Sequence, residues 1–197
     1  VLVSGTNGKG SCCEALAALA LAAGVSVGVT TSPHLRRFNE RIRINGAEAT
    51  DLQIVAAFER IDAVRGDISL SYFEFACLAA LLLFRDADLD LAILEIGLGG
   101  RLDAMNLVDP DISVILPIAL DHQSYLGDTR EAIGFEKAGI LRANGILVLA
   151  DPEPPSSILE EAERQTCQVF RIGWEFDWTD AQVSWMALGH LQCQALT

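Results

Sequence analysis

The sequence predicts an α/β fold in which a mostly parallel sheet carries helices on both faces. Short apolar runs rich in β-branched residues alternate with stretches of helical periodicity, and each run ends in a small or polar residue. Buried parallel strands that are joined by crossover helices give this pattern. The chain has 197 residues, 51% of them apolar, which is enough for one sizeable core.

The apolar runs place strands, in chain order, at residues 1–4, 25–30, 89–96, 112–118 and 146–149. The gaps between them are predicted to form helices at residues 9–23, 51–64, 72–85, 129–141 and 157–166. Gly24 and Gly66 stand where two of these helices are expected to end. Thr50 or Asp51, and Ser156 further on, are typical N-cap residues for two of the helix starts.

The character of the chain changes after Cys167. Aromatic residues at 174, 176, 178 and 185 alternate with polar ones, which favours one or two strands with exposed faces over another crossover unit. We therefore expect an α/β domain at residues 1–167 and the start of a β-rich extension of the same domain at residues 168–197, with a small antiparallel element at the C-terminal end. Because the chain opens directly as a buried strand without Met, we expect it to be part of a longer protein.

Charge and cysteine content exclude several classes of protein. With 27 acidic and 14 basic side chains, the formal net charge is −13, which repels nucleic-acid backbones and anionic lipid. We expect neither nucleic acid nor a membrane as partner, and no apolar run approaches the roughly 20 residues of a membrane span. Five cysteines without C-x-x-C spacing indicate neither a disulfide framework nor a zinc site, which favours a cytoplasmic location.

The clearest sign of chemistry is a glycine-rich stretch between the first strand and the first helix. It consists of Gly5, Thr6, Asn7, Gly8, Lys9, Gly10 and Ser11. The glycines let backbone N–H groups close around an anion, the helix start adds the positive end of its dipole, and Lys9 supplies a charge for the outer phosphates of a nucleotide. The strict P-loop pattern is not met, because Val3 occupies its first glycine position and Gly10 separates Lys9 from Ser11. The alternative is an ordinary glycine-rich turn with a solvated lysine.

Polar residues also follow three other strands: Ser32 after the second, Glu95 at the end of the third, and Asp121 with His122 after the fourth. Parallel strands present their carboxyl ends to one crevice, so we expect these side chains to face the phosphate loop. A buried carboxylate such as Glu95 is costly unless it is paired, and Mg²⁺ is its natural partner beside phosphates.

Each of these signals has an alternative interpretation. Residues 31–34 contain a Thr-Ser-Pro sequence that is common in turns. Glu95 could form an ion pair with Arg101, which lies close by in the following loop. An isolated Asp121-His122 pair is more often a cap than a metal site. The convergence of four strand ends is what favours a functional crevice.

With these residues in place, the chain resembles the folylpolyglutamate synthase and dihydrofolate synthase family of the Mur ligase superfamily. The resemblance rests on stretches in the family's order at residues 3–11, 31–35, 40–46, 71–75, 95–106, 121–122 and 136–140. It implies that residues 5–11 bind the phosphates of ATP, and that Ser32, Glu95 and His122 hold Mg²⁺. Lys137 then corresponds to a carbamylated lysine, which turns a cation into an anion suited to a second Mg²⁺.

The resemblance also implies catalytic roles for Lys9, His122 and Lys137. Contacts to the pterin substrate map to Ser71, Tyr72, Phe73, Glu74, Leu102, Asp103 and Ala104. The implied reaction is ATP-dependent ligation of L-glutamate to dihydropteroate, to folate, or to both, through an acyl phosphate. The family also has a C-terminal ligase domain that lies outside these residues, so we expect this fragment alone to be inactive, and we expect a monomer.

Two further classes stay open from the sequence. A P-loop NTPase or kinase of another family explains the first strand–helix unit and Glu95, but not the stretches at residues 40–46, 71–75 and 136–140. A nucleotide-binding module without activity is disfavoured because the proposed ligands are all intact. Within the superfamily, a peptidoglycan Mur ligase is the nearest alternative.

Overall fold

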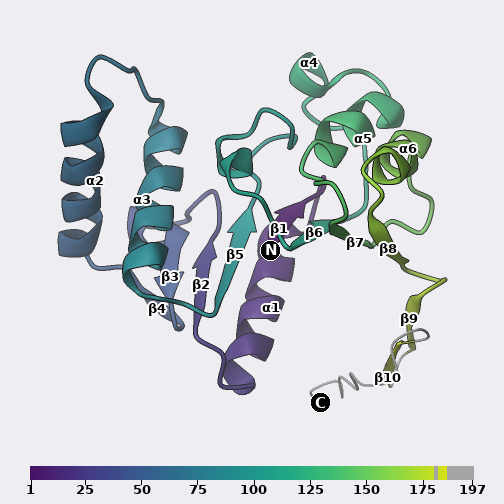
Figure 1. The fold of residues 1–197 in the computed structure, drawn as a ribbon, viewed down its shortest axis with the longest axis horizontal. Helices are drawn as coiled ribbons and strands as arrows, with labels where there is room; N and C mark the ends of the chain where they lie inside the picture. Colours follow the sequence, from purple (N-terminus) through teal and green to yellow (C-terminus); the bar gives the residue numbers. More distant parts are fainter. Residues whose placement is uncertain (180–181, 186–197) are drawn as a thin grey trace.

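Six strands of the main sheet run parallel and point their carboxyl ends to one edge. The structure is a computed structural model that describes residues 1–179 and 182–185, and in these residues the sheet has the order β4-β3-β2-β5-β1-β6-β7-β8 (Figure 1). Its strands are β1 Leu2–Ser4, β2 Val27–Thr30, β3 Ile42–Ile44, β4 Ala47–Glu48, β5 Leu91–Glu95, β6 Ile112–Ile115, β7 Ile146–Leu149 and β8 Gln168–Arg171. β1 lies between β5 and β6, and all pairings from β2 to β8 in this order are parallel. The predicted α/β class is confirmed.

Helices cover both faces of the sheet, but unequally. They are α1 Lys9–Ala22, α2 Asp51–Arg65, α3 Tyr72–Asp86, α4 Gln123–Leu126, α5 Arg130–Ala138 and α6 Ser156–Arg164, with short 3-10 turns at Phe38–Arg41 and Ala104–Leu107. α1 packs on one face through Cys13 and Ala17, against Val3 and Ile93. The larger core on the other face joins α3, α5 and α6 to the sheet, and α2 lies outside α3 (Figure 1).

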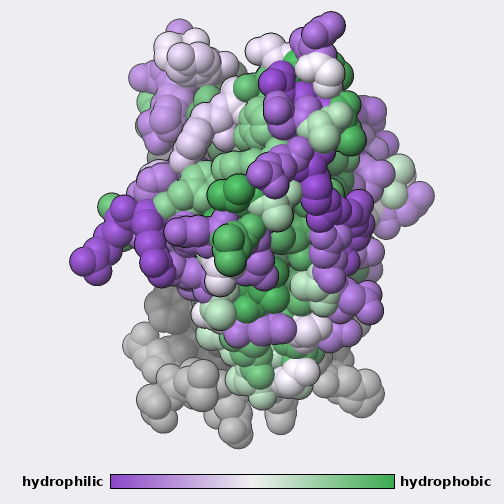
Figure 2. All heavy atoms as spheres, turned by 90° about the vertical axis from the view of Figure 1, so that its left-hand side faces the viewer, coloured by the Kyte–Doolittle hydropathy of each residue, from purple (hydrophilic) through white to green (hydrophobic). Residues whose placement is uncertain are grey.

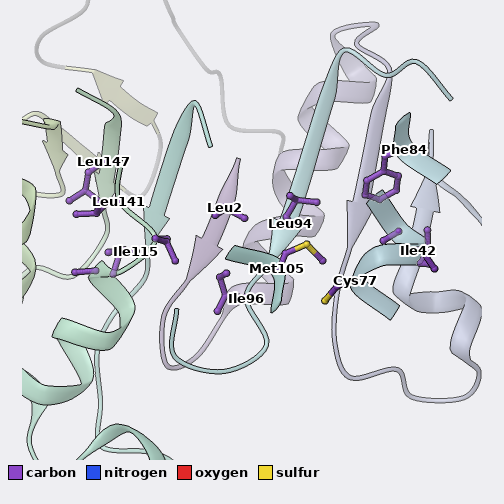
Figure 3. Packing of buried hydrophobic residues seen from close by; sticks show 14 of the residues in the cluster. Leu2, Ile42, Cys77, Phe84, Leu94, Ile96, Met105, Ile115, Leu141 and Leu147 are labelled. Atoms are coloured by element: carbon purple, nitrogen blue, oxygen red, sulfur yellow. The ribbon is translucent and has the colours of Figure 1, made fainter. Parts of the chain in front are cut away.

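Met105 joins the loop after β5 to the larger core. Figure 3 shows its side chain near Leu94 of β5, Ile96 directly after β5, and Cys77 of α3. Met105 is 1% exposed, so the turn that begins at Ala104 is fixed against the sheet edge. The loop that carries Asp103 therefore has a defined position relative to β5.

The hairpin of β3 and β4 was not expected from the sequence. Both strands pair antiparallel, and β3 extends the sheet beyond β2. Asn45 (φ 51°) and Gly46 (φ 81°) form its turn in the left-handed region. An Asn-Gly pair after an alternating Ile-Arg-Ile run is a strong hairpin signal, so this element was present in the sequence pattern.

The C-terminal segment begins differently from the expectation. β8 joins the main sheet beside β7 after the α6 crossover, so residues 168–171 complete one more crossover unit. The small antiparallel element follows as β9 Phe176–Thr179 and β10 Gln182–Trp185, which form a separate pair. Expectations about the remaining C-terminal residues, Cys193 included, lie outside the described part.

The helix starts follow the predicted caps with one exception. The Thr50 hydroxyl accepts from the N–H of Gln53, as expected of an N-cap. α6 instead begins at Ser156 after Pro155, so the prediction of Ser156 as its N-cap is wrong. The carboxylate of Glu131 accepts from the N–H groups of Ser156 and Ser157 and replaces the missing cap.

The face formed by α2 and its neighbours carries apolar surface between polar side chains (Figure 2). On α2, Leu52 and Val64 are both 84% exposed and Val55 is also exposed. No helix in the described residues is both long and apolar enough to span a bilayer.

Candidate active site

The glycine-rich loop of residues 5–11, which is predicted to bind phosphate and is called the phosphate loop below, joins β1 to the start of α1 at the carboxyl edge of the sheet. Gly5 (φ 147°) and Gly8 (φ 83°) adopt backbone conformations that favour glycine. A Cβ on Gly5 would lie 2.6 Å from the Cβ of Leu116, so the loop after β6 leaves no room for a side chain there. The conformation of the loop therefore favours glycine at positions 5 and 8.

Two lysines from distant parts of the chain meet at this loop. The Nζ of Lys9 donates to the carbonyl oxygens of Gly5 and Thr6, at 3.2 and 3.3 Å. The Nζ of Lys137, from α5, donates to the same Gly5 carbonyl at 2.8 Å. The two ammonium groups concentrate positive charge beside the start of α1, where the helix dipole also favours an anion.

Lys137 is buried, with 4% of its surface exposed. Burial, together with the nearby charge of Lys9, lowers the pKa of its amine from 10.5 to about 8. The negative charges of Asp121 and Asp103 act in the opposite direction. A substantial fraction of Lys137 is therefore neutral slightly above neutral pH.

Glu95 ends β5 with its carboxylate directed at the phosphate loop. Its Oε2 accepts from the N–H of Ser32 at 2.7 Å, and a Cβ on Gly10 would lie 3.7 Å from the same oxygen. The residue is 5% exposed, and burial raises the pKa of its carboxyl group. The backbone of Gly10 and the charge of Lys9 favour the ionised form.

The sequence left open an ion pair between Glu95 and Arg101, but Arg101 does not pair with Glu95. Its guanidinium donates instead to Glu136 of α5, with Nη2 at 2.8 Å from Oε1. Glu95 is thus a buried carboxylate held by backbone N–H groups beside the amine of Lys9, a donor set that suits a divalent cation.

Asp121 and His122 lie on the loop between β6 and α4 and face the same recess. The recess is lined by both lysines, by Gly5 and Thr6, and by Gly97, Leu98, Gly99, Asp121, His122 and Leu126. His122 has a left-handed backbone (φ 49°), which is unusual for a residue with a side chain and is often found at functional sites. No group of three His, Cys, Asp or Glu side chains in the described residues could hold a metal by itself, so phosphate or water oxygens would have to complete the coordination.

A second pocket of about 310 Å³ adjoins this recess. Its lining includes six of the seven residues expected to contact the substrate: Ser71, Phe73, Glu74, Leu102, Asp103 and Ala104. Tyr72 is the seventh, and its ring packs edge-on against Phe38 under the guanidinium of Arg41. Three residues, Leu98, Gly99 and Leu126, line both the pocket and the recess.

Asp103 shapes the loop between the two cavities. It accepts from the N–H of Leu98 at 2.8 Å and from the N–H of Met105 at 2.9 Å. Burial raises the pKa of its carboxyl group despite these bonds. Beside it, the ring of Phe73 lies against Gly97, where a Cβ would approach the ring to 2.5 Å.

Several residues of this region were not expected from the sequence. Tyr125 lines the pocket and is 77% exposed, but nothing in the local pattern marks a short helix after His122. Asp151 follows β7 at the same edge, and the rule that parallel strands end at one crevice could have found it. The shared rim of Leu98, Gly99 and Leu126 depends on loop conformation and has no sequence signal.

Comparison with known proteins places this geometry in a family. The profile of the Mur ligase middle domain matches residues 3–187. The chain belongs to the Mur ligase middle-domain family. This Mur ligase domain is 48% identical over 183 residues to the dihydrofolate synthase/folylpolyglutamate synthase of Escherichia coli K12, a match that covers 93% of the chain and 43% of that protein. It is 49% identical over 187 residues to the protein of the same name from Haemophilus influenzae, with 94% and 43% covered.

Solved structures agree with the sequence matches. E. coli FolC in complex with DHPP and ADP superposes on the Mur ligase domain with a TM-score of 0.91 at 46% identity, covering 98% of this chain and 48% of that one. A bifunctional folylpolyglutamate synthase/dihydrofolate synthase with Mn, AMPPNP and L-glutamate bound gives 0.91 at 48% identity, covering 99% and 48%. The chain spans about half the length of the relatives it matches.

Proposed function

We propose that the protein containing this chain is an ATP-dependent amide ligase. It joins L-glutamate to dihydropteroate, to folate, or to both, and the described residues supply the ATP site and the pterin pocket. The names of the relatives and the ligands in the solved structures support this assignment. The expected monomeric state and cytoplasmic location stay predictions.

One observation carries the proposal: the recess with Lys9 and Lys137 and the pocket with Phe73 and Asp103 share a common rim. A ligase of this kind has to bring the γ-phosphate of ATP to the carboxylate of a second substrate. Two adjoining cavities, one cationic and one partly apolar, suit that transfer. An ATPase without a second substrate needs only the cationic cavity.

In the first step, a carboxylate oxygen of the pterin substrate attacks the γ-phosphorus, and the bond to the bridging oxygen breaks to release ADP. In the second step, the neutral amine of glutamate attacks the acyl phosphate carbon, phosphate leaves, and the amine loses a proton. The chain acts mostly by positioning and by charge. Lys9 moves from the carbonyl oxygens of Gly5 and Thr6 to the phosphates, and the N-terminus of α1 offers N–H donors.

The residues present fit two divalent cations. The N–H of Ser32 donates to the carboxylate of Glu95, while His122 and Lys137 line the recess together with Lys9. The charge of Lys9 acts on both Glu95 and Lys137, so the two groups are electrostatically linked. Mg²⁺ bound there would neutralise the phosphate charge and polarise the γ-phosphoryl group. Without a bound cation, the buried charge of Glu95 would be less well compensated, which destabilises the folded protein.

Lys137 fits the role of a carbamate. The ammonium group first loses one proton to solvent. The neutral amine then attacks CO₂, a nitrogen–carbon bond forms, and a second proton leaves, so a cation becomes an anion. Burial beside Lys9 favours the neutral amine that this step needs. The resulting carboxylate oxygens would reach into the recess that His122 also lines.

The test is phosphate release by the full-length protein with ATP and Mg²⁺. We expect release only when both L-glutamate and dihydropteroate or a folate are present, with an amide product detected by mass spectrometry. Omitting either substrate should reduce the rate at least tenfold. Phosphate release that ignores glutamate would contradict ligation and support an NTPase. Activity with a peptidoglycan precursor in place of a pterin would assign the other branch of the family.

A further inference from the structure

Thr6 binds the loop after β6 rather than projecting freely into the phosphate recess. Its Oγ1 donates to the carbonyl oxygen of Ala119 at 3.1 Å and accepts from the N–H of Ala119 at 3.0 Å. Its backbone N–H donates to the carbonyl oxygen of Pro117 at 3.2 Å. The hydroxyl proton and the amide proton of Thr6 are therefore both engaged by residues 117–119, which we call the clasp segment.

The clasp segment also makes hydrogen bonds to Asp151 and Arg130. The N–H of Ile118 donates to Oδ2 of Asp151 at 2.8 Å, and Nε of Arg130 donates to the carbonyl oxygen of Ile118 at 2.9 Å. Arg130 and Asp151 also bond to each other at 2.9 Å, and Asp151 is buried. Arg130 is the first residue of α5, the helix that carries Lys137.

These contacts connect the phosphate loop, the start of α5 and the pair of Asp121 and His122. The phosphate loop bonds to the clasp segment through Thr6, the clasp segment bonds to the start of α5 through Arg130, and the chain continues from Ala119 to Asp121 and His122. A displacement of the clasp segment would therefore move His122 relative to Lys9. Misplacement of reacting groups by about 1 Å is enough to slow catalysis strongly.

We propose that Thr6 is a positioning residue whose hydroxyl fixes the clasp segment, and through it Asp121 and His122, instead of binding phosphate. This inference rests on the proposed function for the role of the recess, but the hydrogen bonds exist without ligand. From the sequence, all of residues 5–11 were expected to bind phosphate. With Thr6 in this other role, Lys9 and the remaining residues of the loop bind the phosphate.

Thr6→Val tests the hydroxyl, because valine keeps the shape and removes both hydrogen bonds to Ala119. Thr6→Ser keeps the hydroxyl and is the rescue variant. Ser26→Ala is the matched control, since the hydroxyl of Ser26 also both donates to and accepts from one residue. Its Oγ donates to the side-chain Oδ2 of Asp90 at 2.6 Å and accepts from the backbone N–H of Asp90 at 2.9 Å, before the first residue of β2. Thr6→Ala replaces Thr6→Val if the valine variant does not fold, as judged by thermal melting.

Hydrogen–deuterium exchange of the ligand-free, full-length protein is the direct readout. In Thr6→Val we expect peptides over residues 116–122 to exchange at least tenfold faster, because the N–H of Ala119 loses its acceptor. Thr6→Ser and Ser26→Ala should match the wild type in these peptides. Unchanged exchange in Thr6→Val would overturn the proposal, whatever the protein catalyses.

Ligation kinetics give the second readout. We expect kcat of Thr6→Val to fall about tenfold while the Kd for MgADP changes less than threefold, and Thr6→Ser to restore kcat to within threefold. A large loss of MgADP affinity with kcat preserved would show that Thr6 binds phosphate and contradict the proposal. A wild type without ligation would refute the proposed function instead, and the exchange result would still decide the role of Thr6.

Discussion

The amines of Lys9 and Lys137 donate to one and the same atom, the carbonyl oxygen of Gly5, at 3.2 and 2.8 Å. The carboxylates of Glu95, Asp103 and Asp121 lie near enough to act on these two cations, but both amines donate to a neutral oxygen. Burial and the charge of Lys9 lower the pKa of Lys137. A bound polyphosphate would supply further negative charge, so we propose that the anion binds at this pair.

Replacing Lys9 with Met should remove the charge that meets the outer phosphates. We expect kcat/KM for ATP to fall by about a hundredfold or more, because charge stabilisation in a partly buried site is a large term in phosphoryl transfer. Steady-state kinetics of the full-length protein measure it. Arg85→Met, which removes an exposed cation beside Asp86, is the control. Equal kinetics in both variants would contradict the role of Lys9.

The lowered pKa of Lys137 predicts a pH-dependent stability. Below about pH 8 the amine is protonated in both folded and unfolded chains; between about 8 and 10.5 only the unfolded chain binds the proton. Unfolding then takes up a proton, so the free energy of unfolding rises with pH, by roughly 1.4 kcal/mol per unit at most. Chemical denaturation in CO₂-free buffer should show this rise in the wild type and not in Lys137→Met. Parallel pH profiles would mean that the amine keeps its ordinary pKa.

Glu95→Gln should weaken cation binding while keeping the fold, since the amide oxygen can still accept from the N–H of Ser32. We expect about tenfold more Mg²⁺ for half-maximal rate and a kcat about a hundredfold lower. Asp90→Asn is the matched control, because Asp90 also accepts from a serine N–H, at Ser26, but lies outside the site. An unchanged Mg²⁺ requirement would remove Glu95 from the metal site.

Gly97→Ala should disturb the pterin pocket through Phe73. The new Cβ would stand 2.5 Å from the Phe73 ring, which has to move toward the pocket it lines. We expect KM for the pterin substrate to rise about tenfold with KM for ATP within threefold. The double variant Gly97→Ala/Phe73→Leu should recover part of the loss, because leucine relieves the clash. Additive losses would show that Gly97 acts in another way.

Local sequence patterns were sufficient for the elements that carry the site. Apolar runs gave β1, β5 and β6, and the glycine pattern located the turn between β1 and α1, because both depend on short-range preferences. The choice of Glu136 over Glu95 as partner of Arg101 could not be predicted, since it depends on how α5 lies against the loop after β5. The same holds for the bonds of Thr6, which join residues 113 positions apart.

We propose that Lys9, Lys137 and Glu95 surround one triphosphate with its divalent cations. This arrangement can be tested by a crystal structure of the full-length protein with AMPPNP and Mn²⁺, in which manganese is located by anomalous scattering. We expect one peak bound by the Glu95 carboxylate and the Ser32 hydroxyl, and a second beside His122 and a carbamate on Lys137. Manganese bound away from Glu95, or a triphosphate outside the loop of residues 5–11, would contradict it.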